Sequence, residues 1–508
     1  MADRKRNQLL IVSDEERRND WLRGKVELPA HQRLMDDGLT FNRYYTHASP
    51  CSPSRASLYT GSYVAQHGVA NNVSFPTHTA LDPDIPTVGS LLNEQGYYSA
   101  YLGKFHLTHD EIPDMEAFGY RDYKGNDMHY TGSAWSGRFF DPIIAGDAIE
   151  WLREHGSRDE PWHLTVALVN PHDIMWFPID HPSFQDEHPD MKKVFDFMKD
   201  LRLKGVPVEA MPEDYDELFD TLPENFHDDL HTKPEIQRAW RQVRNHEHMV
   251  GFMDLSDERS WLRQLDYYAY LHQELDHNLQ GIIDVLDELG IYDDTVIAYT
   301  SDHGDACGSH GLRAKLPCVY EEVMGVPLIM KVPGVTEAGT ETDALATHVD
   351  LATTLCALGG VDVDESPTLS GVDLSPALAD PSASPRDYVF FSQDAAQSEL
   401  ISHTRYAVRG FFDGETKYAR YYGIGGGVDR AGSVDPRPKL FAEDAAFEDH
   451  DHEWYEPAED PHELVNLAND VGRKNELRQH FNRLLEIERI ELGDAAGHGE
   501  AMNSAGRS

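Results

Sequence analysis

Two clusters of acidic residues follow short apolar runs, in positions where they could bind a cation. Asp14 and Glu15 come directly after the run LLIVS, and Asp302 and His303 come directly after the run TVIAYTS. If both runs are strands of one parallel sheet, their carboxyl ends would bring the two clusters together. Carboxylates gathered there repel one another unless a divalent cation such as Mg²⁺, Mn²⁺ or Ca²⁺ neutralises them. The alternative is that Asp14 and Asp302 only cap the turns that follow.

A third segment, SPCSPSRASLYTG, has the pattern of a helix start. Ser52 suits the N-cap, Pro53 the first helical position and Gly61 the exit. Cys51 would then lie just before a helix N-terminus, where free N–H groups favour an anion, with Arg55 one turn along. These residues alone indicate either a nucleophilic thiol of low pKa in an anion site or a buried structural cysteine beside a turn.

The elements that must position these residues alternate along the first 370 residues. Strands are expected at Leu9–Ser13, Tyr98–Leu102, His163–Val169, Thr295–Ser301 and Val326–Lys331, and helices at Thr87–Gln95 and Leu265–Leu289. This alternation predicts an α/β fold, in which residues 1–370 form a large, mostly parallel sheet flanked by helices.

Two other stretches break the alternation. Residues 180–262 are polar and contain Pro, which predicts an insertion of short helices over the active-site end of the sheet. Further along, Asp413-Gly414 lies between two strand-like runs, a hairpin signal, and Glu476–Leu492 has helical spacing. We therefore expect a smaller antiparallel α+β subdomain at residues 371–493, followed by a flexible tail at residues 494–508.

The composition excludes several classes of function. With 44 Lys+Arg against 89 Asp+Glu in 508 residues, the formal net charge is −45, so binding to nucleic acid or to an anionic membrane is not expected. Such acidity is typical of proteins from high-salt cells. No run reaches the roughly twenty apolar residues of a membrane span, and the charged start does not resemble a secretory signal, so we expect a cytoplasmic location. The 4 Cys include no CxxC pair, which argues against a disulfide framework and structural zinc.

The cysteine segment resembles a known signature. CSPSR at residues 51–55 is similar to the C-x-P-x-R signature of the sulfatase family, and SLYTG resembles its continuation. Further resemblances follow in the family's order, namely LLIVSD, QHGV at 66–69, GKFHL at 103–107, NPH at 170–172, TSDHGD at 300–305 with Gly308, His310-Gly311 and Lys315, and EPAEDPHELVNL at 456–467. Almost the whole chain thus resembles the formylglycine-dependent type I sulfatases of the alkaline phosphatase superfamily, and this implies the fold of that superfamily.

The resemblance implies a cofactor and a metal site. Cys51 would be oxidised to formylglycine, an aldehyde that hydrates to a diol and attacks the sulfur of a sulfate ester. One divalent cation, expected to be Ca²⁺ with Mg²⁺ or Mn²⁺ as alternatives, would lower the pKa of the diol. Its implied ligands are Asp14, Glu15, the modified Cys51, Asp302 and His303. Many sulfatases have two adjacent aspartates where this chain has Asp14-Glu15, so Glu15 either reaches the cation, as we expect, or turns toward the substrate.

The resemblance also implies catalytic roles. Arg55 would stabilise the ionised diol, and Asp302 would accept its proton. Lys104 and Lys315 would bind the sulfate oxygens. His172 would bind the substrate and protonate the leaving alcohol. His106 would act as a base in the release of sulfate, and His310 would contact the substrate.

Three other functions stay open at this point. A phosphonate monoester or phosphodiester hydrolase of the same superfamily would share the formylglycine and the metal, although the Lys104–His106 element fits sulfatases better. A non-catalytic member with an unmodified Cys51 would bind a cation or a sulfated ligand. A hydrolase that uses the thiol directly would leave the acidic clusters unexplained.

The expected partners are a small sulfate-ester substrate and the enzyme that generates formylglycine, with neither nucleic acid nor membrane among them. Trp176 and Phe177, just after the NPH element, either form a wall for a sugar or apolar ring or pack the insertion onto the sheet.

The acidic surface should slow the capture of an anionic sulfate ester at low salt, because like charges repel within the Debye length. We therefore predict that kcat/KM for an aryl sulfate rises as the ionic strength is raised from about 10 mM to about 150 mM. Steady-state kinetics over this range tests the prediction, and a monotonic fall would contradict it.

Overall fold

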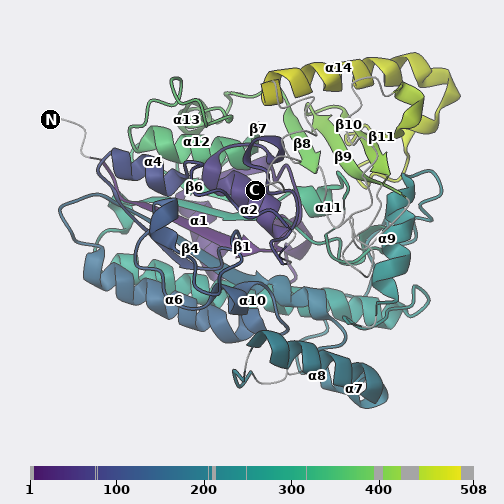
Figure 1. Cartoon of the computed structure of the whole chain (residues 1–508), viewed down its shortest axis with the longest axis horizontal. Helices are drawn as coiled ribbons and strands as arrows, with labels where there is room; N and C mark the ends of the chain where they lie inside the picture. Colours follow the sequence, from purple (N-terminus) through teal and green to yellow (C-terminus); the bar gives the residue numbers. More distant parts are fainter. Residues whose placement is uncertain are drawn as a thin grey trace.

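A seven-stranded sheet lies at the centre of the larger part of the molecule (Figure 1). The computed structural model describes residues 5–74, 76, 78–203, 205–208, 213–247, 249–315, 317–393, 404–424 and 446–493. The strands lie in the order β3-β4-β1-β5-β6-β2-β7. Their bounds are β1 Gln8–Asp14, β2 Leu39–Tyr45, β3 Tyr98–Gly103, β4 Trp162–Pro171, β5 Val296–Ser301, β6 Leu328–Lys331 and β7 Thr340–Thr347.

The sheet is mostly parallel, as predicted, but one strand runs against the others. β1 pairs in parallel with β4 and β5, β3 with β4, and β2 with β7. β6 is antiparallel to both neighbours, β5 and β2, so the expectation of a parallel strand at Val326–Lys331 is wrong in direction. β2 and β7 are absent from the predicted strands because their runs, LTFNRYY and TETDALAT, mix polar with apolar residues.

Successive residues of β1 point to opposite faces of the sheet and belong to two separate cores. Leu10 and Val12 pack with α2, α4 and α12, whereas Leu9 and Ile11 pack with α1, α6 and α10. In Figure 1, α4 and α12 lie above the sheet, and α6 and α10 lie below it. The predicted helices at Thr87–Gln95 and Leu265–Leu289 are thus confirmed. The bounds of these helices are α1 Pro29–Asp37, α2 Cys51–Thr60, α4 Val88–Glu94, α6 Ser136–His155, α10 Glu258–Glu288 and α12 His348–Leu358.

Short helices and 3-10 turns connect these elements. The short α-helices are α3 Val64–His67, α5 Asp127–Tyr130, α11 Glu321–Met324 and α13 Ser375–Ala379. The 3-10 turns are η1 Asn19–Leu22, η2 Met115–Phe118, η3 His172–Trp176, η4 Tyr292–Asp294, η5 Ser309–Gly311, η6 Phe447–Asp449, η7 Leu467–Asn469 and η8 Val471–Arg473.

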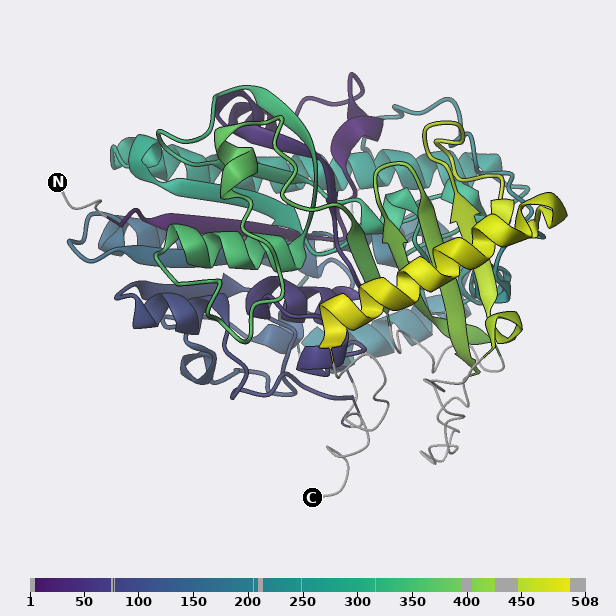
Figure 2. The same ribbon diagram turned by 90° about the horizontal axis from the view of Figure 1, so that it is seen from above.

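A separate antiparallel sheet follows, in the order β11-β10-β9-β8. Its strands are β8 Val389–Gln393, β9 Arg405–Phe412, β10 Lys417–Ile424 and β11 Asp451–Tyr455. Helix α14, Lys474–Leu492, crosses one face of this sheet (Figure 2) and packs Leu477 and Phe481 against it. The predicted hairpin at Asp413-Gly414 and the antiparallel α+β arrangement are confirmed. The boundary at residue 370 stays a prediction, since Leu374 and Ala377 still pack in the core of the large sheet, and the tail at 494–508 lies outside the described residues.

The predicted insertion contains the short helices α7 Pro182–Glu187, α8 Pro189–Leu203 and α9 Glu235–Asn245, and α10 begins before its expected end at residue 262. Trp240 of α9 shares a core with Tyr45 of β2 and Phe391 of β8, so the insertion joins the two sheets. Trp176 and Phe177 are buried in a core with residues of the insertion, which favours the packing interpretation for both. Among the described helices, none is long and apolar enough to cross a membrane.

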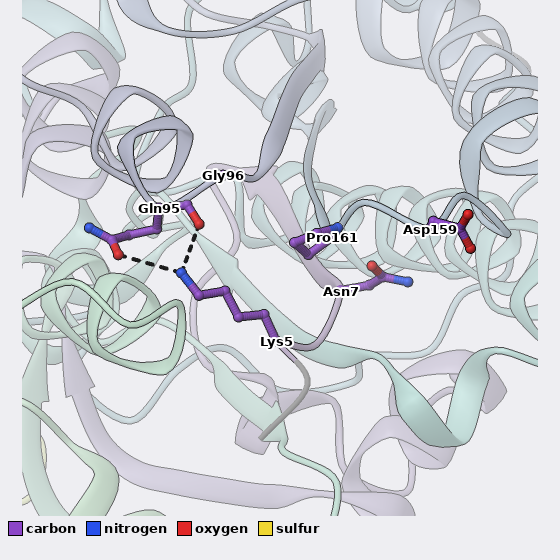
Figure 3. A pocket seen from close by; sticks show the side chains of 6 residues that line it. All are labelled: Lys5, Asn7, Gln95, Gly96, Asp159 and Pro161. Carbon is purple, nitrogen blue, oxygen red and sulfur yellow. Dashed lines mark hydrogen bonds between the residues drawn. The ribbon is translucent and has the colours of Figure 1, made fainter. Parts of the chain in front are cut away.

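The amino ends of the strands carry little that could do chemistry. A pocket at this edge contains one carboxylate and neither Cys nor His, and Lys5 Nζ donates to the Gln95 carbonyl oxygen there at 2.7 Å (Figure 3). Its lining residues are Lys5, Asn7, Gln95, Gly96, Asp159 and Pro161. We therefore expect the reactive side chains at the carboxyl ends of the parallel strands.

Gly103, the last residue of β3, has φ +93°, and a Cβ there would lie 2.0 Å from the Ala167 carbonyl oxygen. Gly96 has φ +84° but nothing within 4 Å of the same position. We predict that Gly103→Ala lowers the free energy of unfolding by about 2 kcal/mol more than Gly96→Ala, because both variants share the left-handed strain and only one has the clash. Urea unfolding of the two variants checks this, and equal losses would contradict it.

Candidate active site

Four adjacent strands of the large sheet bring polar residues to one edge. Asp14 ends β1, Lys104 follows β3, His172 follows β4 and Asp302 follows β5, and these strands are neighbours in the order β3-β4-β1-β5. The predicted meeting of the two acidic clusters is confirmed, since the Glu15 N–H donates to Asp302 Oδ1 at 3.1 Å. The site is thus built from loops at the carboxyl ends of parallel strands.

Cys51 lies at the centre of this edge and is fully buried. Its Sγ is 3.3 Å from His303 Nε2, 3.8 Å from Asp14 Oδ1 and 3.8 Å from Lys104 Nζ. Burial and the negative charge of Asp14 raise the pKa of Cys51 to about 11, although Lys104 offsets part of the effect. Of the two interpretations of this segment, the raised pKa argues against the low-pKa thiol, and a hydrolase that uses this thiol directly loses its main support.

Helix α2 holds Cys51 in its first turn. The helix begins at Cys51 itself with Pro50 as the N-cap residue, so the expected N-cap at Ser52 is wrong. Ser52 Oγ instead donates to the His106 carbonyl oxygen at 2.6 Å and so ties the helix to the loop after β3. Gly61 ends the helix at φ 66°, as predicted, with its N–H bonded to the Ser57 carbonyl.

Arg55, one turn along α2, joins the two acidic clusters. Its Nη2 donates to Asp14 Oδ2 at 2.8 Å and its Nε donates to Asp302 Oδ2 at 2.9 Å, and all three side chains are fully buried. Lys104 Nζ lies 2.5 Å from Asp14 Oδ2. Burial alone would raise the pKa of Asp14, but Lys104, His172 and Arg55 hold it well below its usual range. Asp14 is therefore an ionised carboxylate at neutral pH.

Glu15 has a different environment from its neighbour. Its backbone is left-handed, with φ 70°, and Lys315 Nζ lies 2.5 Å from Glu15 Oε2. His172 Nε2 is 3.6 Å from the same oxygen, and Glu15 Oε1 is buried without a hydrogen-bond partner. Burial raises the pKa of Glu15 well above its usual value despite the charge of Lys315. Glu15 thus lies between the site's second lysine and the histidine of the NPH element.

The ligand atoms of Asp14, Cys51, Asp302 and His303 all lie within 4.8 Å of one another, in a buried group that could hold a metal ion. A second such group in the described part of the chain consists of Asp14, Glu15 and His172. Four of the five expected ligands therefore come together in one group. Ligation by Glu15 stays a prediction, because it belongs to the other group.

The remaining two histidines of the prediction differ in their surroundings. His106 is buried at φ 58°, and neither ring nitrogen has a hydrogen-bond partner. Burial and the charge of Lys104 hold the pKa of His106 well below its usual range, so the ring is neutral. The contacts of His310 are instead to Asp228, through Nδ1 at 2.8 Å, and to the ring of Tyr320, stacked at 3.9 Å. The structure thus does not bring His310 into the group around Cys51.

Two carboxylates that the sequence analysis missed hold the loops that carry His106 and His172. Asp127 accepts hydrogen bonds from the N–H groups of residues 105 and 106, both at 2.8 Å. Asp141 accepts from the N–H groups of residues 169 and 170, at 2.7 and 2.8 Å. Both are buried, and neither stands in a motif. The one available signal was an acidic residue before Pro142 in an otherwise apolar stretch.

A buried polar network lies behind the first acidic cluster. Glu16 accepts hydrogen bonds from Ser13 Oγ at 2.5 Å and from the Tyr299 hydroxyl. His31 Nε2 is 3.4 Å from Glu16 Oε1, and His31 Nδ1 is 2.6 Å from Asp276 Oδ1. Burial alone would lower the pKa of His31, but its hydrogen bonds with these two carboxylates raise it to about 9. A buried imidazolium therefore anchors the loop that carries Asp14.

Comparison with known proteins agrees with this geometry. The family model named Sulfatase matches residues 6–361, and the model N-sulphoglucosamine sulphohydrolase, C-terminal, matches residues 308–423. The N-acetylglucosamine-6-O-sulfatase of Bacteroides thetaiotaomicron is 26% identical over 396 residues, which cover 72% of this chain and 68% of that protein.

Solved structures show the same fold. A 2-O GAG sulfatase has a TM-score of 0.70 at 21% identity, covering 96% of this chain and 93% of that chain. A phosphonate monoester hydrolase from Silicibacter pomeroyi has a TM-score of 0.68 at 19% identity, covering 96% of both chains. The architecture is therefore shared by hydrolases of more than one ester class.

The fold is thus one that solved hydrolases share. The chain belongs to the sulfatase family, since the family model matches well over half of it, and it is a sulfuric ester hydrolase. All the residues gathered around Cys51 fall inside the matched region.

The His31 network makes stability depend on pH. The pKa of His31 rises from 6.5 to about 9 on folding, so its stabilisation is complete below about pH 6.5 and is lost as the pH rises through about 9. We predict that His31→Gln destabilises the protein most near pH 6 and least near pH 10. Denaturant unfolding at several pH values measures this difference, with the exposed His246→Gln as control. A loss of stability that is independent of pH would contradict it.

Proposed function

We propose that the protein hydrolyses a sulfate monoester to an alcohol and inorganic sulfate, using formylglycine made from Cys51 and one divalent cation, Ca²⁺ in the first instance. The observation that carries this proposal is the buried group formed by Asp14, Cys51, Asp302 and His303. Membership of the sulfatase family supports the reaction class.

The donor set fits a hard cation. Two carboxylates and one imidazole are ligands that Ca²⁺, Mg²⁺ and Mn²⁺ accept, and Asp14 is held ionised by its neighbours. A protonated thiol is a poor ligand for such a cation, whereas the oxygens of a hydrated aldehyde at Cys51 would be suitable. When bound, the cation and the hydrated aldehyde would supply an activated oxygen nucleophile and offset negative charge on the sulfate.

The buried lysines would bind the sulfate oxygens. Lys104 Nζ is 3.8 Å from Cys51 Sγ, and Lys315 Nζ lies beside Glu15 on the other side of the acidic cluster. Each carries a compact charge with three donors, which suits a sulfate group. Arg55 is already bonded to Asp14 and Asp302, so its role is to hold both carboxylates in place.

The histidines would move the protons. His172 Nε2, 3.9 Å from Asp14 Oδ1, would protonate the alcohol oxygen as the ester S–O bond breaks. Burial and the charge of Lys315 lower the pKa of His172, and a bound sulfate would oppose this effect by pairing with the lysine. His106, with both ring nitrogens unpartnered, would act as the base in the step that releases sulfate. The net reaction consumes one water and yields the alcohol, sulfate and a proton.

A second candidate is hydrolysis of a phosphonate monoester or a phosphodiester, favoured by the likeness to the phosphonate monoester hydrolase. Lys104 and His106, two residues apart on the loop after β3, favour sulfate. Rates on an aryl sulfate and on the matching aryl phosphonate decide between them, and faster phosphonate cleavage would replace the first proposal.

The conversion of Cys51 is tested by mass spectrometry of the tryptic peptide Tyr44–Arg55 from protein purified from its native cells. We expect one oxygen to replace the sulfur and two hydrogens of the thiol. Cys51→Ala should lower kcat for an aryl sulfate roughly a thousandfold or more, because the nucleophile is removed.

Cys356→Ala is the matched control, because Cys356 is equally buried but lies in the core of the large sheet. It should leave the activity unchanged. An unmodified thiol in an inactive protein would instead support a binding protein.

A further inference from the structure

A groove with a volume of about 450 Å³ lies along one side of helix α9, in the insertion. This volume is within the range of pockets that bind small molecules. Helix α9 lines the groove with four planar amide or guanidinium groups at the spacing i, i+3, i+4 and i+7, namely those of Arg238, Arg241, Gln242 and Asn245. Residues at this spacing share one face of a helix, so one wall of the groove carries a row of hydrogen-bond donors. Leu255, 37% exposed, adds an apolar surface.

The two guanidinium groups in this row form no salt bridge within the described part of the chain. Arg241 donates to backbone instead, from Nη1 to the carbonyl oxygens of residues 228 and 310, at 2.7 and 3.3 Å, and from Nη2 to that of residue 229 at 3.1 Å. Arg238 Nη1 is 3.2 Å from His231 Nδ1. These contacts orient both side chains without neutralising them. In a chain with a formal net charge of −45, two such cations on one helix turn indicate a place for an anionic group.

The carboxylates nearest to Arg241 do not replace that anion. Burial lowers the pKa of Arg241, and the charges of Asp228 and Asp229 oppose the effect from a distance. Asp228 is bonded to His310 Nδ1 at 2.8 Å and lies 3.6 Å from Lys233 Nζ, so its charge is already paired.

The groove also contains hydrogen-bond acceptors. Asn245 is only 2% exposed, and its Nδ2 donates to the Gly311 carbonyl oxygen at 3.2 Å while its Oδ1 has no partner. A buried acceptor without a partner costs free energy, which a hydroxyl donor would recover. Asp229 and Asp254 also line the groove, where they would repel a small inorganic anion but accept hydrogen bonds from hydroxyl groups. Hydroxyl groups together with one sulfate or carboxylate, as on an anionic sugar unit, would satisfy both sets.

A short piece of chain joins the groove to the proposed site. Gly311 lies directly behind the lining residues, since a Cβ there would be 2.9 Å from Leu255 Cδ2 and 3.4 Å from Arg241 Nη1. Lys315, four residues further along, has its Nζ 2.5 Å from Glu15 Oε2. Four residues of chain span at most about 14 Å, so a ligand of a few sugar units is long enough to reach from the groove to the site.

We propose that this groove binds a further sugar unit of a sulfated oligosaccharide whose reacting unit lies beside Cys51. Arg238 and Arg241 bind the sulfate or carboxylate of the further unit, and Asn245 Oδ1 accepts from one of its hydroxyl groups. The inference rests on the proposed function and gives the substrate a size, at least two sugar units, in place of the small ester expected from the sequence.

The test measures the binding of sulfated tetrasaccharides by calorimetric titration. Tetrasaccharides prepared from heparin, chondroitin sulfate and carrageenan are titrated into wild type and Arg238→Gln. Arg238 is exposed, so its replacement should leave the fold intact. We expect Kd for at least one tetrasaccharide to rise about tenfold, because a charge-assisted hydrogen bond to the anionic group is lost. No binding to wild type, or an unchanged Kd for every tetrasaccharide, would overturn the proposal.

Two further variants show whether the effect belongs to the groove. Arg241→Gln should weaken the same tetrasaccharide as Arg238→Gln does. The matched control is Arg489→Gln, which removes an exposed arginine from helix α14 and should change Kd by less than about twofold. Equal losses in Arg238→Gln and Arg489→Gln would reduce the effect to general electrostatics and reject the groove.

Hydrolysis of 4-nitrophenyl sulfate shows whether one chain spans the groove and the site. This small ester should keep its kcat/KM within about twofold in Arg238→Gln, and the tetrasaccharide that binds should inhibit its hydrolysis competitively. Binding that depends on Arg238 without such inhibition would reject the spanning substrate. If wild type hydrolyses no sulfate ester, an arginine-dependent Kd would still retain the sugar site while the proposed reaction is rejected.

Discussion

The pairing of Arg55 with Asp14 and Asp302 is the interaction on which the rest of the site depends. The two carboxylates lie on neighbouring strands, fully buried, where like charges without compensation would force one of them to take up a proton. One guanidinium bonded to both removes that conflict and at the same time fixes helix α2 against the sheet edge. Because Cys51 lies one turn earlier on the same helix, this ion pair also helps to fix its position.

The molecule is therefore strongly negative overall, whereas the buried site contains a cluster of positive side chains. The formal net charge is −45, yet the buried edge of the sheet gathers Arg55, Lys104 and Lys315 around its carboxylates. An anionic ester approaches a repulsive surface but enters a site in which cations are already desolvated and oriented. Such preorganised charges act strongly because no water has to be rearranged around them.

Much of this could be predicted from the sequence, because the informative residues follow strands and lie in short motifs. The strand-then-acid pattern at Asp14 and Asp302 was sufficient to place both at one edge. The predictions that were wrong concerned features that depend on tertiary packing. Ser52 looks like an N-cap residue, but its hydroxyl oxygen accepts from the Val73 N–H and its proton is donated to the His106 carbonyl oxygen. The low pKa expected for Cys51 ignored burial and the adjacent carboxylate, and neither can be read from a helix-start pattern.

Residues whose side chains fix the backbone of a distant loop could not be predicted from the sequence, for a different reason. Asp127 and Asp141 accept hydrogen bonds from N–H groups far from them in sequence, and no spacing rule encodes such a contact. The direction of β6 likewise depends on which strands it joins, not on its own apolar run.

The positions of Asp127 and Asp141 have a consequence for how such a protein can evolve. The loops of His106 and His172 come from different strands, yet both are fastened to one short stretch, α5 and the start of α6. Substitutions in that stretch would disturb two loops of the candidate site at once, so it should tolerate little change.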